Sequence, residues 1–182
     1  MKNFSIVFIF ISAFALTAYA QKAKPTPAKK TTTTATNPAA DEKAVRQTFE
    51  DLLTGIRNSN IDAVTGVYWN SPQTLYFNSN GSITIGWDQD RKNRESRYPR
   101  ISNVKLEVSQ VRVTMLGSDG ALVTCLWKQT QDFDANTETA AGRMTLVFRK
   151  IGKDWKVIHL HTSPTTPSTD RPVMPSERQP QQ

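Results

Sequence analysis

The chain of 182 residues has a single cysteine, Cys125, so no disulfide can form within it. It has two histidines and lacks a zinc-site spacing, a phosphate-binding glycine loop and the glycine-flanked serine of a hydrolase. Cys125 lies in the apolar run 121–127, where we interpret it as a small buried hydrophobe. These absences exclude the enzyme classes that carry such signatures, and they leave pockets assembled from scattered residues.

An apolar run long enough for a typical membrane-spanning helix is also lacking. The run 4–16 is short, follows Lys2 and ends before an Ala-Tyr-Ala triplet at 18–20, the pattern of a signal-peptidase site. We therefore expect residues 1–20 to be a signal peptide and the protein to be exported, either to a periplasm or outside the cell. An uncleaved anchor is the alternative.

Large apolar residues are absent from residues 21–40, and the tail 164–182 has a similar composition, so we expect both to be disordered. The formal net charge is +7, and four of the lysines lie in this linker at positions 22, 24, 29 and 30. Nucleic-acid binding needs a basic patch on a folded face, so we do not expect it. A solvated tether is the preferred role for the linker, and contact with an anionic cell surface is the alternative.

The remaining residues, 41–163, have the pattern of one α+β domain with helices on one face of a sheet. Val104, Leu106 and Val108 share one parity whereas Val111 and Val113 share the other, so we expect a bulge near residues 109–110. Periodicity predicts helices over 41–58, 61–68 and 86–98. Strands 74–77 and 83–85 are predicted to form a hairpin around Asn80-Gly81. Four long strands follow from Val104 onward, and Asn136 is the predicted pivot of one of their turns.

Several short motifs give this domain a family resemblance. The motifs are Tyr68-Trp69-Asn70-Ser71-Pro72, Gly86-Trp87, Gly142-Arg143-Met144-Thr145, Gly152-Lys153-Asp154-Trp155 and His159-Leu160-His161-Thr162-Ser163. With these motifs the domain resembles the SnoaL-like branch of the nuclear transport factor 2-like superfamily. The closing strand is also similar to the association domain of calcium/calmodulin-dependent kinase.

The resemblance implies a cystatin-like α+β roll, in which a curved antiparallel sheet packs against three helices to form a cone. It also implies a pocket at the open end of the cone and a homodimer formed through the sheet. Isomerases, cyclases, dehydratases, binding modules and assembly domains share this fold, so the fold does not choose among them.

His159 and His161 are the first candidate site residues. Alternation along a strand predicts that they share one face with Trp155 and Val157 and point into the pocket, where they could move protons or hold a ligand. Ordinary hydrogen bonding beneath the helices is the alternative. No third ligand lies nearby, so we expect no metal site. Arg143 on the preceding strand would add a fork of donors for a carboxylate or phosphate. The alternatives are a surface residue or an ion pair with Asp132, Asp134 or Glu138.

The third predicted helix adds an aromatic and basic face. Trp87, Arg91, Arg94 and Tyr98 follow helical spacing, so this face lines the pocket or is solvated. Trp127 adds either pocket wall or core.

A catalytic acid or base is not evident, because Asp62, Asp88, Asp90 and Glu95 have no apolar setting in the sequence that would tune a pKa. We therefore expect a non-catalytic domain that binds an anionic or aromatic small molecule without a cofactor. One alternative is a cofactor-independent isomerase, cyclase or dehydratase that uses a pocket histidine as general base. The other is a dimerisation or assembly module.

Overall fold

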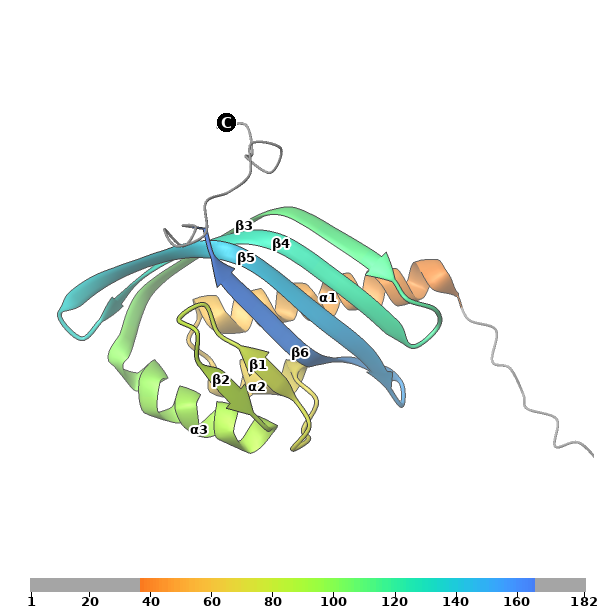
Figure 1. The fold of residues 1–182 in the computed structure, drawn as a ribbon, viewed down its shortest axis with the longest axis horizontal. Helices are drawn as coiled ribbons and strands as arrows, with labels where there is room; N and C mark the ends of the chain where they lie inside the picture. The colour runs from red at the N-terminus through yellow and green to blue at the C-terminus, as the bar shows by residue number, and fades with distance from the viewer. Residues whose placement is uncertain (1–36, 166–182) are drawn as a thin grey trace, which may run out of the picture. The chain divides into compact units, whose positions relative to one another are not determined.

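The computed structural model describes residues 37–165 (Figure 1). The predicted signal peptide, most of the predicted linker and nearly all of the predicted tail lie outside these residues. None of the helices in this range is long and apolar enough to cross a membrane. The elements are α1 (Pro38–Arg57), α2 (Ile61–Val67), β1 (Leu75–Phe77), β2 (Ile83–Ile85), α3 (Trp87–Arg97), a short 3-10 helix η1 (Tyr98–Arg100), β3 (Ile101–Met115), β4 (Gly120–Phe133), β5 (Asn136–Ile151) and β6 (Asp154–Pro164).

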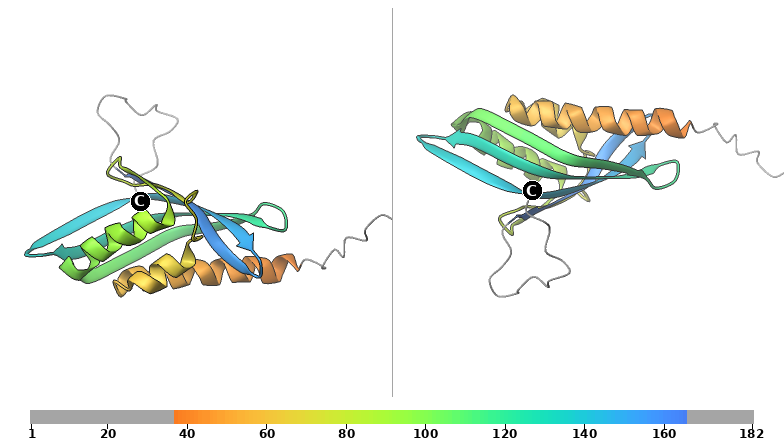
Figure 2. Two further views of the ribbon diagram at one scale, coloured as in Figure 1. Left: turned by 90° about the horizontal axis from the view of Figure 1, so that it is seen from below. Right: turned by 90° about the horizontal axis from the view of Figure 1, so that it is seen from above.

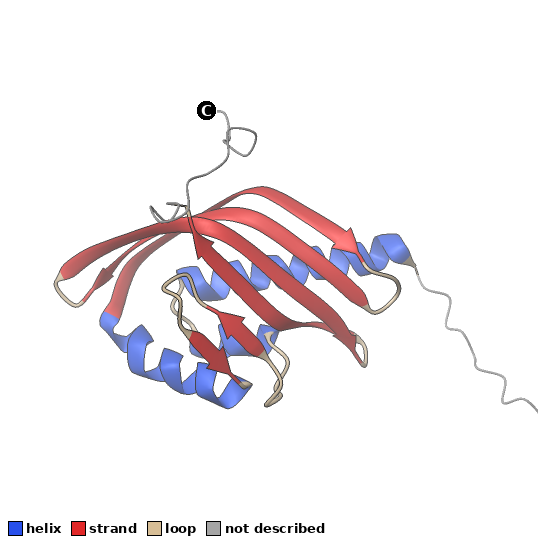
Figure 3. Cartoon of the chain, viewed as in Figure 1, coloured by secondary structure: helices blue, strands red, loops and turns tan. Residues whose placement is uncertain are grey.

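The six strands form one curved sheet in the order β2-β1-β6-β5-β4-β3. Figure 3 shows the long strands β3 to β6 curving over the helices, so the predicted α+β fold class is confirmed. Every pairing is antiparallel except that of β1 with β6, which is parallel. The sheet is therefore mixed rather than purely antiparallel.

The core lies between α1 and the inner face of the sheet (Figure 2). The helical spacing predicted for α1 is confirmed, because Val45, Phe49 and Leu53 are at most 1% exposed. They belong to one buried cluster with Leu146 and Phe148 from β5. Burial of these large side chains is the main driving force for closing the sheet over the helix.

Both N-terminal caps come from asparagine. The Asn37 side chain accepts a hydrogen bond from the Ala40 amide at 3.2 Å, and the Asn60 side chain accepts one from the Ala63 amide at 2.9 Å. The cap on α2 was predicted, whereas α1 begins three residues earlier than predicted, at Pro38. Proline suits this first position because its missing N–H would have no partner there.

The turn between β4 and β5 differs from the prediction. Its positive backbone angle is at Asp134, with φ of 51°, and the predicted pivot Asn136 already belongs to β5. The Asp134 amide donates to the Arg100 carbonyl at 3.0 Å, and the two side chains form an ion pair. The guanidinium carbons of Arg97 and Arg100 lie 4.5 and 4.2 Å from the centre of the Phe133 ring. These contacts hold the β4–β5 hairpin against the end of α3.

Three register shifts interrupt the long strands. The one predicted near residues 109–110 is confirmed, because the pairing register slips between Ser109 and Arg112. Two others were not predicted. One lies in β3 between Ser102 and Lys105. The other is a bulge in β6, where Val147 pairs with His159 but Phe148 pairs with Val157, which leaves Ile158 without a partner. The extra residue reverses the alternation of every later side chain in β6.

A partly buried ion pair joins the start of α1 to the sheet. The Asp41 carboxylate accepts hydrogen bonds from the Lys150 ammonium and from the Trp155 indole N–H. The hydrogen bond from Lys150 is the largest cause that lowers the pKa of Asp41. Since the folded pKa lies below that of the unfolded chain, the pair stabilises the fold above about pH 4 and the stabilisation is lost as the pH falls through the folded pKa.

We therefore predict that Asp41→Asn lowers the free energy of unfolding at neutral pH, and that the difference from the unchanged protein narrows toward pH 3. Urea denaturation at the two pH values measures both quantities. Glu42→Gln is the matched control, because Glu42 pairs with Arg46 at the helix surface. A difference that stays constant with pH would contradict the assigned role of the Asp41 charge.

Candidate functional site

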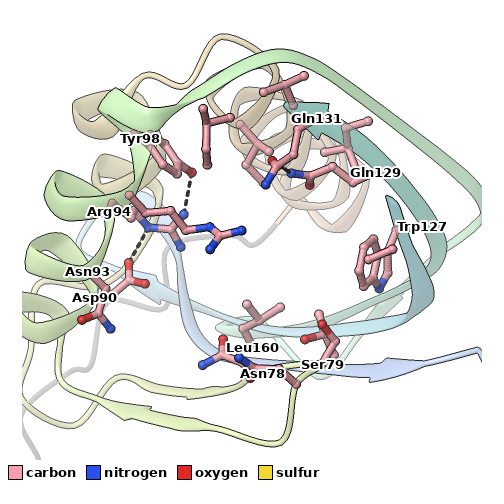
Figure 4. Close-up of a pocket in the computed structure, with 18 of the residues that line it drawn as sticks. Asn78, Ser79, Asp90, Asn93, Arg94, Tyr98, Trp127, Gln129, Gln131 and Leu160 are labelled. Carbon is pink, nitrogen blue, oxygen red and sulfur yellow. Dashed lines mark hydrogen bonds and ion pairs between the residues drawn. The ribbon is translucent and has the colours of Figure 1, made fainter. Parts of the chain in front are cut away.

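A cavity of about 530 Å³ opens between α3, the inner face of the sheet and the C-terminal half of α1 (Figure 4). Its apolar lining comes from α1, from the end of α2 and from the long strands. Its polar lining comes from α3, from the loop between β1 and β2, and from β4. The apolar lining residues are Leu52, Ile56, Tyr68, Ile101, Val104, Leu106, Trp127, Ala140, Met144 and Leu160.

One wall of the cavity carries a buried ion pair on α3. The Arg94 Nε donates to the Asp90 Oδ2 at 2.7 Å, and the Arg94 Nη1 donates to the Tyr98 hydroxyl at 2.7 Å. The side chains of Arg94 and Asp90 are only 16% and 9% exposed. The Arg94 guanidinium carbon also lies 5.7 Å from the ring centres of Tyr68 and Tyr98. These contacts fix the guanidinium at the cavity surface.

Burial sets the protonation of two tyrosines behind this wall. Desolvation raises the pKa of Tyr68 and of Tyr76 far above the physiological range, and the negative charge of Asp90 adds to the rise at both. The Tyr76 hydroxyl is the one buried side-chain polar atom of residues 37–165 that lacks a hydrogen-bond partner. Both phenols therefore keep their protons at neutral pH.

The aromatic and basic face predicted for the third helix is divided between two environments. Arg94 and Tyr98 line the cavity, whereas the Trp87 indole N–H donates to the Thr65 carbonyl at 2.8 Å in α2. Arg91 forms ion pairs with Asp62 and Glu95, both 2.8 Å long. The division arises because α2 covers only the N-terminal part of this helix face.

The opposite wall is formed by β4. Trp127, Gln129 and Gln131 alternate along the strand and all line the cavity, as Figure 4 shows. The Gln129 amide donates to the Gln131 carbonyl oxygen at 2.6 Å, and the Gln131 amide donates to the Glu138 carboxylate at 3.2 Å. Arg97 completes the chain with an ion pair to Glu138 at 2.7 Å. Polar side chains therefore connect the sheet wall to the end of α3.

A glycine in the next strand determines the position of the Trp127 indole. Trp127 pairs with Gly142 in β5, and its indole N–H donates to the Arg143 carbonyl at 3.3 Å. A Cβ at Gly142 would lie 3.2 Å from the indole nitrogen and 2.0 Å from the Ser163 carbonyl oxygen. Only glycine permits this close approach.

Besides Trp87 and Arg91, three predicted site residues do not line the cavity, namely Arg143, His159 and His161. The bulge at Ile158 places Leu160 and Thr162 on the cavity, so His159 and His161 turn to the outer face of the sheet. The Phe77 ring packs edge-on against both imidazoles, with centroid distances of 5.2 and 5.7 Å.

The hydrogen bonds of two of these residues agree with that placement. The His159 Nδ1 lies 3.1 Å from the Leu75 carbonyl oxygen. Arg143 is exposed, and its Nη1 donates to the Pro164 carbonyl at 3.3 Å. The expected floor of imidazoles and guanidinium is therefore corrected. The extra residue in β6 turns the two imidazoles outward, and Arg143 faces outward on β5 because its buried neighbours Gly142 and Met144 face inward.

Sequence reasoning did not place several polar residues in the cavity, among them Gln129, Gln131 and Glu138. Asp90, which the sequence presented only as an acid without an apolar setting, also lines the cavity. The two glutamines share the parity of Trp127, and that signal was sufficient to find them. Asp90 is four residues before Arg94, but its burial depends on how α3 packs in the fold. Among residues 37–165, no group of three or more His, Cys, Asp or Glu side chains is placed to hold a metal ion.

A family model for the SnoaL-like domain matches residues 45–167. The chain belongs to the SnoaL-like family. No curated protein matches it. Solved structures similar to this SnoaL-like protein belong to the nuclear transport factor 2-like superfamily, so the predicted resemblance is confirmed.

Three of these structures illustrate the range of similarity. A nuclear transport factor 2-like superfamily protein from Salmonella enterica has 19% identity and a TM-score of 0.66, covering 75% of this chain and 100% of its own. A protein named as a candidate dehydratase from Streptomyces avermitilis has 16% identity and a TM-score of 0.64, with coverage of 72% and 100%. A ketosteroid isomerase-like protein from Erwinia carotovora has 18% identity and a TM-score of 0.59, with coverage of 70% and 98%. At these identities the similarity shows the fold alone.

Proposed function

We propose that this SnoaL-like domain binds a small organic molecule in the cavity between α3 and the sheet. The observation that carries the proposal is the cavity itself, because about 530 Å³ with an apolar floor and convergent polar groups is typical of a ligand site. Arg94, Tyr98 and Trp127, which were predicted as pocket residues, would contact the ligand. The sequence pattern of residues 1–20 supports the further proposal that the protein is exported, and sequencing the N-terminus of the mature protein tests it.

Trp127→Leu tests the binding proposal. Native mass spectrometry of the protein purified from its own export route should detect a bound small mass that a denaturing spectrum lacks. We predict that Trp127→Leu weakens binding of that molecule about tenfold or more, because a large aromatic contact is removed from a desolvated pocket. Lys128→Ala is the matched control, since Lys128 is the exposed neighbour in the same strand. A protein that carries no small mass and binds no member of a fragment library would contradict the proposal.

A proton-transfer enzyme is the second candidate, and one observation favours it. The nearly buried Asp90 carboxylate is fixed by Arg94, and the Tyr98 hydroxyl, which accepts from Arg94, retains its own proton for donation. A base and a donor on one wall suit a cofactor-independent isomerisation or dehydration. Asp90 thus replaces the histidines of the sequence-based hypothesis, because they lie on the other face of the sheet.

The molecule identified by mass spectrometry provides the test of this candidate. Incubated in D2O, the enzyme should convert it or exchange one of its carbon-bound protons, and Asp90→Asn should abolish the reaction while Asp88→Asn should not. Asp88 is the exposed neighbour on the same helix. Unchanged ligand after incubation with the unaltered protein would exclude the enzyme and leave the binding proposal intact.

We also propose that two copies pair through the outer face of the sheet. This face exposes Ile83 and Ile85 of β2, which are 62% and 66% exposed, and Leu126 of β4, which is 38% exposed. Apolar side chains this exposed favour burial against a partner. The mass in solution at micromolar concentration, measured by light scattering, tests the proposal, and the mass of a single chain would contradict it.

A further inference from the structure

We infer that the cavity takes an uncharged, polyhydroxylated saturated ring, which is the chemistry of a sugar or a cyclic polyol. The inference rests on the proposed binding function and identifies its ligand class. It replaces the anionic or aromatic ligand expected from the sequence. Three features of the cavity support it: the pairing of its charges, the number of neutral hydrogen-bonding groups, and the fixed indole of Trp127.

The charges that line the cavity are already paired. Its two guanidiniums belong to Arg94 and Arg97, and its two carboxylates to Asp90 and Glu138. Each guanidinium forms a 2.7 Å ion pair with one carboxylate. A charged ligand would compete with an existing pair for its guanidinium or carboxylate, and separating a buried pair is unfavourable. An uncharged ligand leaves both pairs intact.

Neutral hydrogen-bonding groups outnumber the charged ones in the lining. A hydroxyl group both donates and accepts, so a polyol needs donors and acceptors in close alternation. Within the described residues, the Gln129 carbonyl oxygen has no donor and the Arg94 Nη2 has no acceptor, so both are available to a ligand. The neutral groups are on Ser59, Asn78, Ser79, Asn80, Ser82, Thr84, Asn93, Tyr98, Gln129, Gln131 and Thr162.

The Trp127 indole supplies a flat apolar surface next to these groups. Its N–H donates a hydrogen bond to the Arg143 carbonyl, and the absence of a side chain at Gly142 allows the ring to lie against β5. The face of an aromatic ring is electron-rich, so it packs well against the weakly positive C–H groups on one face of a saturated ring. Gln129 and Gln131 occupy the next inward positions of β4, beside such a ring. One strand therefore offers both a stacking surface and hydrogen bonds.

The test uses the mature protein and the indole N–H resonance of Trp127 in a proton–nitrogen NMR spectrum. The chain has four tryptophans, so Trp127→Leu assigns the resonance by its disappearance. The neutral probes are methyl β-D-glucopyranoside, methyl β-D-galactopyranoside and myo-inositol. Methyl β-D-glucuronide is the charged counterpart of the first probe, and phenol and benzoate are the aromatic probes.

We expect at least one neutral polyol to shift the Trp127 resonance in a saturable way and to bind about tenfold more tightly than the glucuronide. Gln131→Leu should weaken that binding, and the exposed-site control Lys128→Ala should leave it unchanged. A glucuronide that binds as tightly as the glucoside would overturn the inference. Binding of phenol or benzoate without any polyol would also overturn it while leaving the proposed binding function in place. If no probe binds and native mass spectrometry finds no ligand, the inference and the proposed function both fail.

Discussion

Gly142→Ala is expected to destabilise the domain by about 3 kcal/mol or more, at the upper end of the effects of overpacking. The new Cβ would lie 2.0 Å from the Ser163 carbonyl oxygen and 3.0 Å from its carbon. Both atoms belong to the backbone of the adjacent strand β6, so no rotation of a side chain can relieve the clash. β5 and β6 must move apart there, and the backbone hydrogen bonds around the paired residues Gly142 and Pro164 must lengthen or break.

Urea denaturation measures this effect, and Gly66→Ala is its matched control. A Cβ at Gly66 would have no atom within 4 Å, and alanine is the better helix former inside α2. The control should therefore equal or exceed the unaltered protein in stability. Ordinary surface substitutions change the free energy of unfolding by less than about 0.5 kcal/mol. If Gly142→Ala lowers it by no more than that, β5 and β6 can move apart at little cost and the predicted clash is contradicted.

Arg94→Met has the second largest expected effect. It should lower the free energy of unfolding by about 3–5 kcal/mol, because it leaves the Asp90 carboxylate buried without its partner. Arg94 is 16% exposed and Asp90 is 9% exposed, so water cannot replace the lost hydrogen bond at little cost. The same substitution should remove ligand binding, since Arg94 also holds the Tyr98 hydroxyl in place.

A double-mutant cycle separates two contributions to the loss of stability: the unpaired charge of Asp90 and the lost contacts of the Arg94 side chain. Combining Arg94→Met with Asp90→Asn removes the isolated charge, so the double variant should be more stable than Arg94→Met alone. Arg91→Met is the control, because Arg91 forms its ion pairs at the surface of the same helix and its loss should change stability little. Additive effects of the two cavity substitutions would contradict direct coupling between Asp90 and Arg94.

Local patterns were sufficient to predict most of the fold. The spacing of Val45, Phe49 and Leu53 predicted the buried face of α1, and Asn60 predicted the start of α2. The change of parity along β3 predicted its bulge near Ser109. Each of these signals depends on residues only a few positions apart, so it can be recognised in one sequence without knowledge of the tertiary structure.

The site was predicted only in part, because long-range packing determines it. The bulge in β6 leaves no mark in the sequence, since Val157 to Leu160 is apolar apart from His159 and reads as an unbroken strand. An error of one residue there moved both histidines to the wrong face. Asp90 reads as an exposed acid on a charged helix, and only the packing of α3 in the tertiary fold buries it.

The unpaired Ile158 also separates two tasks within β6. Before it, Trp155 and Val157 belong to the core, and after it Leu160 and Thr162 line the cavity. The bulge rotates the second half of β6 relative to the first, so inward side chains of the first half pack in the core and those of the second half face the cavity. Leu160 also packs against the edge of the core, whereas Thr162 does not belong to it. A change at position 162 can therefore reshape what the cavity accepts while the packing of the core stays the same. The strand thus combines a fixed structural half with a half in which ligand preference is free to diverge.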